Sequence, residues 1–471
     1  MNHKHIKIFI ALLVALFIFP ATVTDVLYRD DAYRLSISGG YWWWMGRPLA
    51  DVTAWLTSNS TSAIINSHPL GLICSAAIFV FVIFFIIDKK LVVDEAYAVV
   101  PLPLIIISPF FIQNIAYQYD APGMVLGLSF ALLSYFILSL KSNYKHTLSF
   151  ACIFVSLSLY QPTANIFLGL SAANLLIKLR NYEKGKFFNL VEECLVFAIA
   201  YILYYLFIIK LLSMSGAGRG NILPISELYG SLAHTFNQLR GFISPLLNPL
   251  LKLQLALFTI IAAGWCVLGS LRCRVPLLTI AKQAAFVALS VAMMFFAIIG
   301  VSFIVPEGIA GVRVLVGFGS VYYLLCALTI KFLNQNKPII VMLIVSLPTL
   351  TCSYQFFKYS SEQRRFEYNV LNNIINETNG YNKVYIIGNM KEAPPVKRAM
   401  AENKALTLLL SPAQPWVYKR LAYSLGATNV DQGWSDKPAE AGVIARDGRI
   451  VSDGRYYRVI QNVSDAVVEM K

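Results

Sequence analysis

Apolar stretches long enough to cross a bilayer recur from the first residues of the chain to the region of residue 357. A membrane-spanning helix needs roughly 17–25 mostly apolar residues, and helices satisfy their own backbone hydrogen bonds in lipid. Counting such stretches predicts about eleven spans. They cover residues 5–23, 68–87, 96–112, 122–140, 147–160, 163–178, 190–212, 253–271, 277–303, 312–331 and 338–357. The predicted fold is therefore a polytopic α-helical membrane protein.

Acidic residues are unevenly placed along the chain and mark a boundary near Lys358. Charged residues make up only 14% of the whole sequence, against about a quarter in a typical soluble domain. Of the 25 Asp and Glu residues, 13 precede Lys358 and 12 lie in the last 114 residues. We therefore predict a transmembrane domain over 1–357 and a small water-soluble α/β domain over 358–471.

Four segments of the tail indicate mixed secondary structure. "KVYIIGN" (383–389) and "ALTLLLS" (405–411) are expected to be strands. "PWVYKRLAYSLGA" (415–427) has apolar residues at helical spacing and a glycine near its end. "GVIARDGRIVSDGRYYRVI" (442–460) contains two Asp-Gly pairs between alternating residues, which predicts a hairpin-like series.

Basic residues in the short loops indicate the orientation of the spans. If the loops alternate sides, one face collects Lys4, Lys7, Lys89, Lys90, Lys141, Lys145, Lys178–Lys186, Arg272, Arg274, Lys331 and Lys337. The positive-inside rule makes this face cytoplasmic, with the N-terminus on the same side. The first span is expected to remain as a helix rather than to be cleaved as a signal peptide. A first external loop (24–67), a long external loop (213–252) and the tail would then lie outside.

The formal charge of +14 does not indicate nucleic-acid binding, because most basic residues of the apolar region lie in short loops where they set orientation. The seven cysteines form neither a metal pattern nor a disulfide framework and are expected to be packing residues. No glycine motif that cradles phosphates is present on the cytoplasmic side, which excludes a nucleotide-driven pump. Any chemistry is therefore expected outside, on a substrate already in the membrane.

The stretch "YRDDAYR" follows the first span directly and places Asp30 beside Asp31. In one interpretation the two acids begin a helix and pair with Arg34 one turn away. In the other, one acid is a general base that removes a proton from a sugar hydroxyl, while nearby cations such as Arg29 and Arg34 balance a departing phosphate. The residues alone leave both interpretations open.

Three consecutive tryptophans, Trp42–Trp44, come next and are typical of a membrane interface. They cannot all point the same way, and stacking of one ring on a sugar is the alternative. "PLADVTAWL" (48–56) places Leu49, Val52 and Leu56 on one face of a helix, as expected for a helix that lies in the interface.

Six strings, taken together and in order, resemble the phage-type serotype-converting O-antigen glucosyltransferases, which are similar to C-type (GT-C) membrane glycosyltransferases. They are "RDDAYR", "GRPLADV", "NSHPLG", "YQYDAPGM", "LYQPTAN" and "RVLVG", over roughly residues 25–320. The resemblance implies a bacterial inner-membrane enzyme that moves glucose from undecaprenyl-phosphate-glucose to a lipid-linked O-antigen sugar in the periplasm. It also implies inversion at the anomeric carbon, a membrane-lipid environment, and dependence on a donor synthase and a flippase.

The resemblance also assigns residues position by position. It places the base on Asp30 or Asp31 and a third acid at Asp120, for which capping of the following helix is the alternative. It supplies substrate-binding candidates at Arg29, Arg34, Arg47, His68, Tyr117, Tyr119, Gln161 and Arg313, with Arg219 and Arg240 as weaker ones. Alternatives are a helix start for His68, backbone satisfaction near Pro162 for Gln161, and an interfacial anchor for Arg313. "YQYD" has Gln118 where the family often has a basic residue.

Two other classes of protein remain as alternatives. A transporter or flippase of polyprenyl-linked sugars would place polar residues within its spans and often show repeated halves. An O-antigen polymerase or ligase would rely on a large external loop rather than on paired acids. No resident cofactor or dedicated metal site is expected, although dependence on a divalent ion stays open. The tail, which matches no family string, is expected to govern the choice of acceptor.

Overall fold

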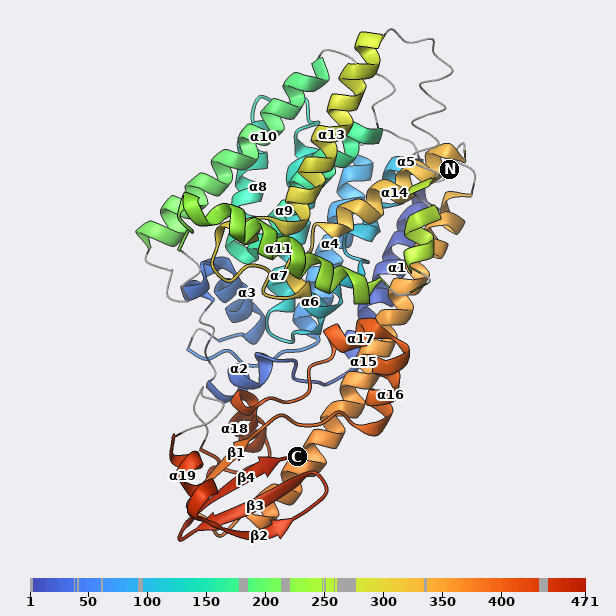
Figure 1. The fold of residues 1–471 in the computed structure, drawn as a ribbon. Helices are drawn as coiled ribbons and strands as arrows, with labels where there is room; N and C mark the ends of the chain where they lie inside the picture. The colour runs from blue at the N-terminus through green and yellow to red at the C-terminus, as the bar shows by residue number, and fades with distance from the viewer. Residues whose placement is uncertain are drawn as a thin grey trace.

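Long helices pack side by side in one part of the molecule, and a small mixed sheet stands at the opposite end, as Figure 1 shows for this computed structural model. The structure describes residues 3–37, 39, 42–60, 62–91, 96–177, 185–212, 221–247, 249, 251–257, 259–260, 277–333, 337–431 and 439–471. The long helices are α1 (His3–Val23), α4 (Leu70–Asp88), α7 (Ala121–Ile137), α8 (Lys145–Leu159), α9 (Gln161–Ile177), α10 (Gly185–Tyr204), α13 (Leu277–Ile299), α14 (Phe318–Phe332) and α15 (Pro338–Glu377).

Several of these helices have the length and composition of membrane spans. Within the described ranges, five helical segments qualify: His3–Val23, Leu70–Asp88, Tyr97–Ala116, Asn189–Leu211 and Pro338–Glu377. Shorter apolar helices are Ala121–Ile137, Lys145–Leu159, Ala284–Ile299 and Phe318–Phe332. The mostly helical architecture with apolar helices is confirmed. The count of about eleven stays a prediction, and most of the expected span 253–271 lies outside the described residues.

The expected span at 96–112 is an interrupted helical segment rather than one continuous helix. It consists of α5 (Ala96–Val99), η2 (Leu102–Ile105), η3 (Pro109–Phe111) and α6 (Ile112–Ala116). Pro101, Pro103 and Pro109 explain the interruptions, because proline lacks the backbone N–H that a helix interior needs. The segment is buried throughout, which lets neighbouring helices satisfy its backbone in place of lipid.

Short elements collect where the long helices end. The first loop forms α2 (Asp31–Ile37), η1 (Trp43–Met45) and α3 (Pro48–Ser58). The loop expected at 213–252 contains α11 (Ile225–Leu246), while residues 213–220 lie outside the described part. Three further elements are the π-helical end of α10, η4 (Tyr205–Leu211), and the 3-10 turns η5 (Ser302–Ile304) and η6 (Val312–Val314). These elements bring the chain segments of the candidate site to one end of the bundle (Figure 1).

The tail contains a four-stranded sheet in the order β1-β4-β3-β2. β1 (Lys383–Ile387) pairs parallel with β4 (Asp465–Met470), and β3 (Tyr457–Asn462) pairs antiparallel with β4 and with β2 (Arg449–Asp453). The helices of the tail are α16 (Pro394–Glu402), α17 (Lys404–Leu409), α18 (Pro415–Ser424) and α19 (Ala439–Asp447). The strand expected at 383–389 and the helix expected at 415–427 are confirmed.

Two sequence predictions for the tail are wrong. Residues 405–411 form most of α17 and not a strand, because the Asn403 side chain accepts a hydrogen bond from Ala405 N and caps a helix. The first part of the series expected at 442–460 is helix α19, which ends before Gly448, so the first Asp-Gly pair stops a helix. The second pair, Asp453-Gly454, stands between β2 and β3 as a hairpin requires.

Helix α15 connects the two parts of the molecule without a break. It is 40 residues long and passes through Lys358, where the sequence predicts a domain boundary. Its lower half packs against α18 and the sheet in a second apolar core that also includes Leu27 of the first loop. The Arg364 guanidinium donates to Leu27 O at 2.7 Å. The tail is thus bonded directly to the first loop, while the division at 357/358 stays a prediction.

Candidate active site

Asp31 ties the first loop to the segment that precedes α7. Its carboxylate accepts hydrogen bonds from the backbone nitrogens of Tyr28 (2.9 Å), Gln118 (3.0 Å) and Tyr119 (3.3 Å). The residue has no exposed surface. Burial raises the pKa of Asp31 to about 8, although the three amide donors act in the opposite direction. Asp31 therefore holds two loops together, out of contact with solvent.

Asp30 faces the other way and lies at the surface beside a cation. Its side chain is 41% exposed, and one carboxylate oxygen lies 3.6 Å from Nη1 of Arg313. Nη1 of Arg313 also donates to the hydroxyl of Tyr117, whose ring lies 5.1 Å from the guanidinium carbon. The structure thus joins three predicted residues from segments that lie far apart in the sequence.

The backbone of Arg313 is held from two sides. Its carbonyl oxygen accepts hydrogen bonds from Nδ2 of Asn114 at 3.1 Å and from the hydroxyl of Tyr160 at 3.0 Å.

Arg29, next to Asp30, adopts a left-handed backbone conformation with φ 45°, which is costly for a residue with a Cβ. Its Nε is buried and has no hydrogen-bond partner among the described residues. Two arginines therefore accompany the exposed acid.

Asp120 forms a buried ion pair with Arg34. Nε of Arg34 lies 3.0 Å from Oδ2 of Asp120, and both side chains are less than a tenth exposed. Nε1 of Trp42 donates to the other carboxylate oxygen, and the Arg34 guanidinium stacks 3.7 Å from the centre of the Trp42 ring. Burial acts to raise the pKa of Asp120, but Arg34 and the Trp42 hydrogen bond outweigh it and the pKa is lowered. Although Asp120 precedes α7, its side chain makes no capping hydrogen bond.

Arg47 and Gln161 form a third connection, between the first loop and α9. Nε of Arg47 donates to Oε1 of Gln161 at 2.8 Å, and Nε2 of Gln161 donates to the Tyr204 hydroxyl at 2.8 Å. The Arg47 guanidinium also lies 4.6 Å from the centre of the Tyr160 ring. Because Arg47 and Arg313 both lower the pKa of Asp120, their charges act on the same region as the buried pair.

The remaining predicted residues contribute to packing or to a neighbouring network. Nε2 of His68 lies 3.0 Å from Ala21 O, so the ring is held against the end of α1. Gln118 accepts from Nδ2 of Asn66 and donates to Asp25, which gives its neutral amide a bridging role. Tyr119 is buried with Trp42, Ala50, Ala54 and Ile64. Arg240 is exposed on α11, and Arg219 lies outside the described residues.

The model of one protein family covers the residues that contact Asp30, Asp31, Asp120 and Arg47. Residues 19–324 match the family described as "Glucosyl transferase GtrII", which is well over half of the chain. The chain belongs to the GtrII glucosyl transferase family. A protein of Salmonella phage P22, named "Uncharacterized 55.3 kDa protein in gtrB 5'region", is 28% identical over 162 residues, which are 34% of this chain and 33% of the phage protein. The chain thus matches about a third of that relative's length. No solved structure matches significantly.

Membership of the GtrII family confirms the resemblance found in the sequence and supports glucosyl transfer over transport. The matched region contains the first loop and ends shortly after Arg313, so the Asp30–Arg313 pair lies inside the GtrII domain. The sheet of the tail lies beyond it. Among the described residues, no group of three or more His, Cys, Asp or Glu could hold a metal ion.

The sequence missed residues of the GtrII domain that position the predicted ones. Tyr160 contacts both Arg47 and the Arg313 backbone, and its place directly before Gln161 in "LYQPTAN" could have drawn attention to it. Asn114 and Tyr204 carry no comparable signal, because each lies in an apolar run. Gly46 was also missed: its φ is 74°, and a Cβ there would lie 2.6 Å from the Tyr204 hydroxyl.

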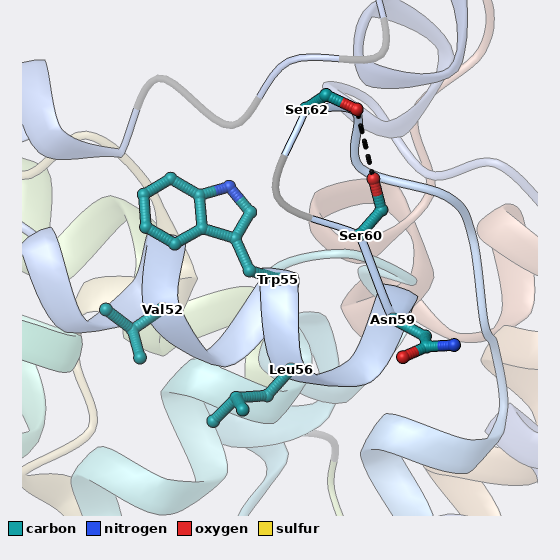
Figure 2. A pocket seen from close by; sticks show the side chains of 6 residues that line it. All are labelled: Val52, Trp55, Leu56, Asn59, Ser60 and Ser62. Carbon is teal, nitrogen blue, oxygen red and sulfur yellow. Dashed lines mark hydrogen bonds between the residues drawn. The ribbon is translucent and has the colours of Figure 1, made fainter.

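One face of α3 in the GtrII domain is apolar and exposed, as the sequence predicts for a helix in an interface. Figure 2 shows Val52, Trp55 and Leu56 along this face, with Asn59, Ser60 and Ser62 where the helix ends. Trp42 is buried, whereas Trp43 and Trp44 are exposed, so the three tryptophans point in different directions as expected. The first loop therefore has a polar inner side with the arginines and an apolar outer side.

Proposed function

We propose that this protein is an inverting glucosyltransferase that moves glucose from undecaprenyl-phosphate-glucose to a hydroxyl of a lipid-linked O-antigen sugar. The proposal is supported by GtrII membership and by apolar helices that could cross a membrane. The observation that carries it is the exposed Asp30 carboxylate beside Arg313 at one end of those helices. An acid next to a cation at this position suits a donor whose phosphate emerges from the lipid.

The reaction needs a base for the acceptor and positive charge for the leaving group. Asp30 takes the proton of the acceptor hydroxyl as its oxygen attacks the anomeric carbon of glucose. The bond between that carbon and the phosphate oxygen breaks at the same time, and the phosphate leaves with the electron pair. Arg313 and Arg29 balance the charge that develops on the phosphate. One displacement inverts the anomeric carbon.

Asp30 is the base in this proposal because its side chain is 41% exposed, whereas Asp31 and Asp120 are both buried. A general base must reach the proton that it removes, so geometry is weighed before pKa. Asp31 is fully buried against backbone amides, and Asp120 is occupied by Arg34 and Trp42. These two acids instead fix the loops that carry Asp30 and Arg34. Arg47, Gln161 and Tyr117 border the same region and supply contacts for sugar or phosphate.

The proposed setting is the bacterial inner membrane, with the N-terminus in the cytoplasm and both Asp30 and the tail in the periplasm. A donor synthase and a flippase would supply the lipid-linked glucose on that side. The hydrogen bonds between the tail and the first loop support a role of the tail in acceptor choice. Transplanting the tail into a relative of different specificity should change the product.

The experiment that tests the proposal combines a chemical and a kinetic comparison. O-antigen from cells with and without the gene is compared by linkage analysis, and glucose transfer from labelled donor is measured in membranes. Asp30→Asn is expected to lose at least about 100-fold in rate, as for removal of a general base. Glu362→Gln, an exposed acid on α15, is the matched control and should retain activity. Full activity of Asp30→Asn in normally inserted protein would refute the base assignment.

A further inference from the structure

Helix α11 has three different sides along its length. Its buried side chains are Thr235, Leu239 and Leu246. Large apolar residues spaced by four, three and four positions form an exposed stripe on a second side: Ile225, Tyr229, Leu232 and Phe236. The third side is exposed and polar, with His234, Asn237 and Arg240. Such a helix suits a position where protein, lipid and water meet.

The apolar stripe borders a groove between α11 and α13. The groove has a volume of about 470 Å³ and is lined by Tyr229, Leu232, Ala233, Phe236, Asn237 and Phe295. The rings of Phe236 and Phe295 lie 6.3 Å apart. Its lining is almost entirely apolar and aromatic, with one amide. The groove therefore suits a hydrocarbon ligand rather than a sugar.

The groove is joined through α11 to the loop that carries Arg313. The hydroxyl of Ser231 donates to Phe303 O at 2.7 Å, and Ile309 N donates to Oε1 of Gln238 at 2.9 Å. Just before the helix, Leu223 N donates to Ile304 O at 3.0 Å. The segment between Phe295, at one wall of the groove, and Arg313 is thus hydrogen-bonded to α11.

We propose that this groove binds the isoprenoid tail of the lipid-linked sugar donor while the donor phosphate lies at Arg313. The inference rests on the proposed function and extends it to the lipid part of the substrate. A prenyl phosphate has an anionic head and an apolar, methyl-branched tail, which match the arginines and the groove respectively. Bulk phospholipid also has an apolar tail. The hydrogen bonds between α11 and the Arg313 loop favour a ligand that contacts the groove and Arg313 together, as a prenyl phosphate would.

A comparison of donor lengths tests the proposal with the full-length enzyme. The two donors are undecaprenyl-phosphate-glucose and an analogue with a single five-carbon prenyl group. Phe236→Ala is expected to raise KM for the long donor about tenfold, because it removes apolar contact area, with little change in kcat. KM for the short donor should not change. Phe81→Ala, which removes an exposed ring on α4, is the matched control and should behave like the unmodified protein. An equal effect on both donors, or no effect on the long one, would overturn the assignment.

A binding measurement separates this proposal from the proposed function. The protein is placed in nanodiscs of phosphatidylethanolamine and phosphatidylglycerol and is irradiated with a polyprenyl phosphate that carries a diazirine within its isoprenoid tail. Adducts are expected on α11 and around Phe295, and undecaprenyl phosphate should compete for them. Adducts elsewhere, or equal competition by added phosphatidylglycerol, would overturn the groove assignment. Adducts in the groove without any glucose transfer by the unmodified enzyme would leave the groove standing and refute the proposed reaction.

Discussion

Nε of Arg34 lies 3.0 Å from Oδ2 of Asp120 although the two residues are 86 positions apart in the sequence. Both side chains are nearly inaccessible, and Trp42 covers the pair from one side. Such a pair does not by itself imply stability, since two charges lose their hydration when they are buried. Its consequence is geometric: it fixes the first loop against the N-terminus of α7.

Removal of one partner of this pair should destabilise the protein strongly. Asp120→Ala leaves the Arg34 guanidinium buried without its carboxylate, and we expect a loss of about 3 kcal/mol in the free energy of unfolding. The measurement is thermal unfolding in detergent. Arg34→Met combined with Asp120→Leu should recover much of that loss, because no unpaired charge remains. A single-variant loss below about 1 kcal/mol would contradict a buried pair.

Asp31 should make the stability of the protein fall with rising pH. Its folded-state pKa is raised to about 8, whereas the pKa of an aspartate in the unfolded chain is about 3.9. The folded state therefore holds a proton that the unfolded state has released, so its contribution is present below about pH 4 and is lost as pH rises towards about 8. Between these pH values, the free energy of unfolding of Asp31→Asn should change less with pH than that of the unmodified protein. Identical profiles would contradict the raised pKa.

Gly46→Ala should disturb the Arg47–Gln161 connection. A Cβ at this position would approach the Tyr204 hydroxyl and the Ile209 side chain, and the backbone is in the left-handed region that favours glycine. We expect a loss of about 2 kcal/mol in stability together with reduced glucose transfer. Gly442→Ala on α19 is the control, because a Cβ there meets nothing within 4 Å. Equal behaviour of the two variants would show that Gly46 is not constrained.

Cysteine labelling should establish the orientation of the first loop. In a protein without its natural cysteines, Ser62→Cys is expected to react with a membrane-impermeant maleimide added from the periplasmic side. Lys89→Cys, at the opposite end of α4, should react only after the inner membrane is opened. The positive-inside distribution of basic residues is the physical basis of this expectation. The reverse pattern would place Asp30 in the cytosol and remove the proposed reaction.

The sequence predicted the local features of this protein better than its long-range contacts. The length of the apolar runs predicted most of the long helices, and ordered strings brought Asp30, Arg313 and Arg47 to attention. No pattern could reveal that Arg34 pairs with Asp120 or that Asp31 accepts three backbone hydrogen bonds, because these contacts depend on how distant segments pack. The strand prediction for residues 405–411 was wrong for a related reason, because capping by Asn403 outweighed the strand propensity of these residues.

The uninterrupted helix α15 has a mechanical consequence for the tail. Its 40 residues extend about 60 Å, whereas the hydrocarbon core of a bilayer is only about 30 Å thick. The remaining length runs into the tail, where it packs against α18 and the sheet. Each residue inserted into α15 would rotate the sheet by about 100° around the helix axis. Exchange of the tail between relatives therefore preserves its orientation only when the junction keeps the helical phase.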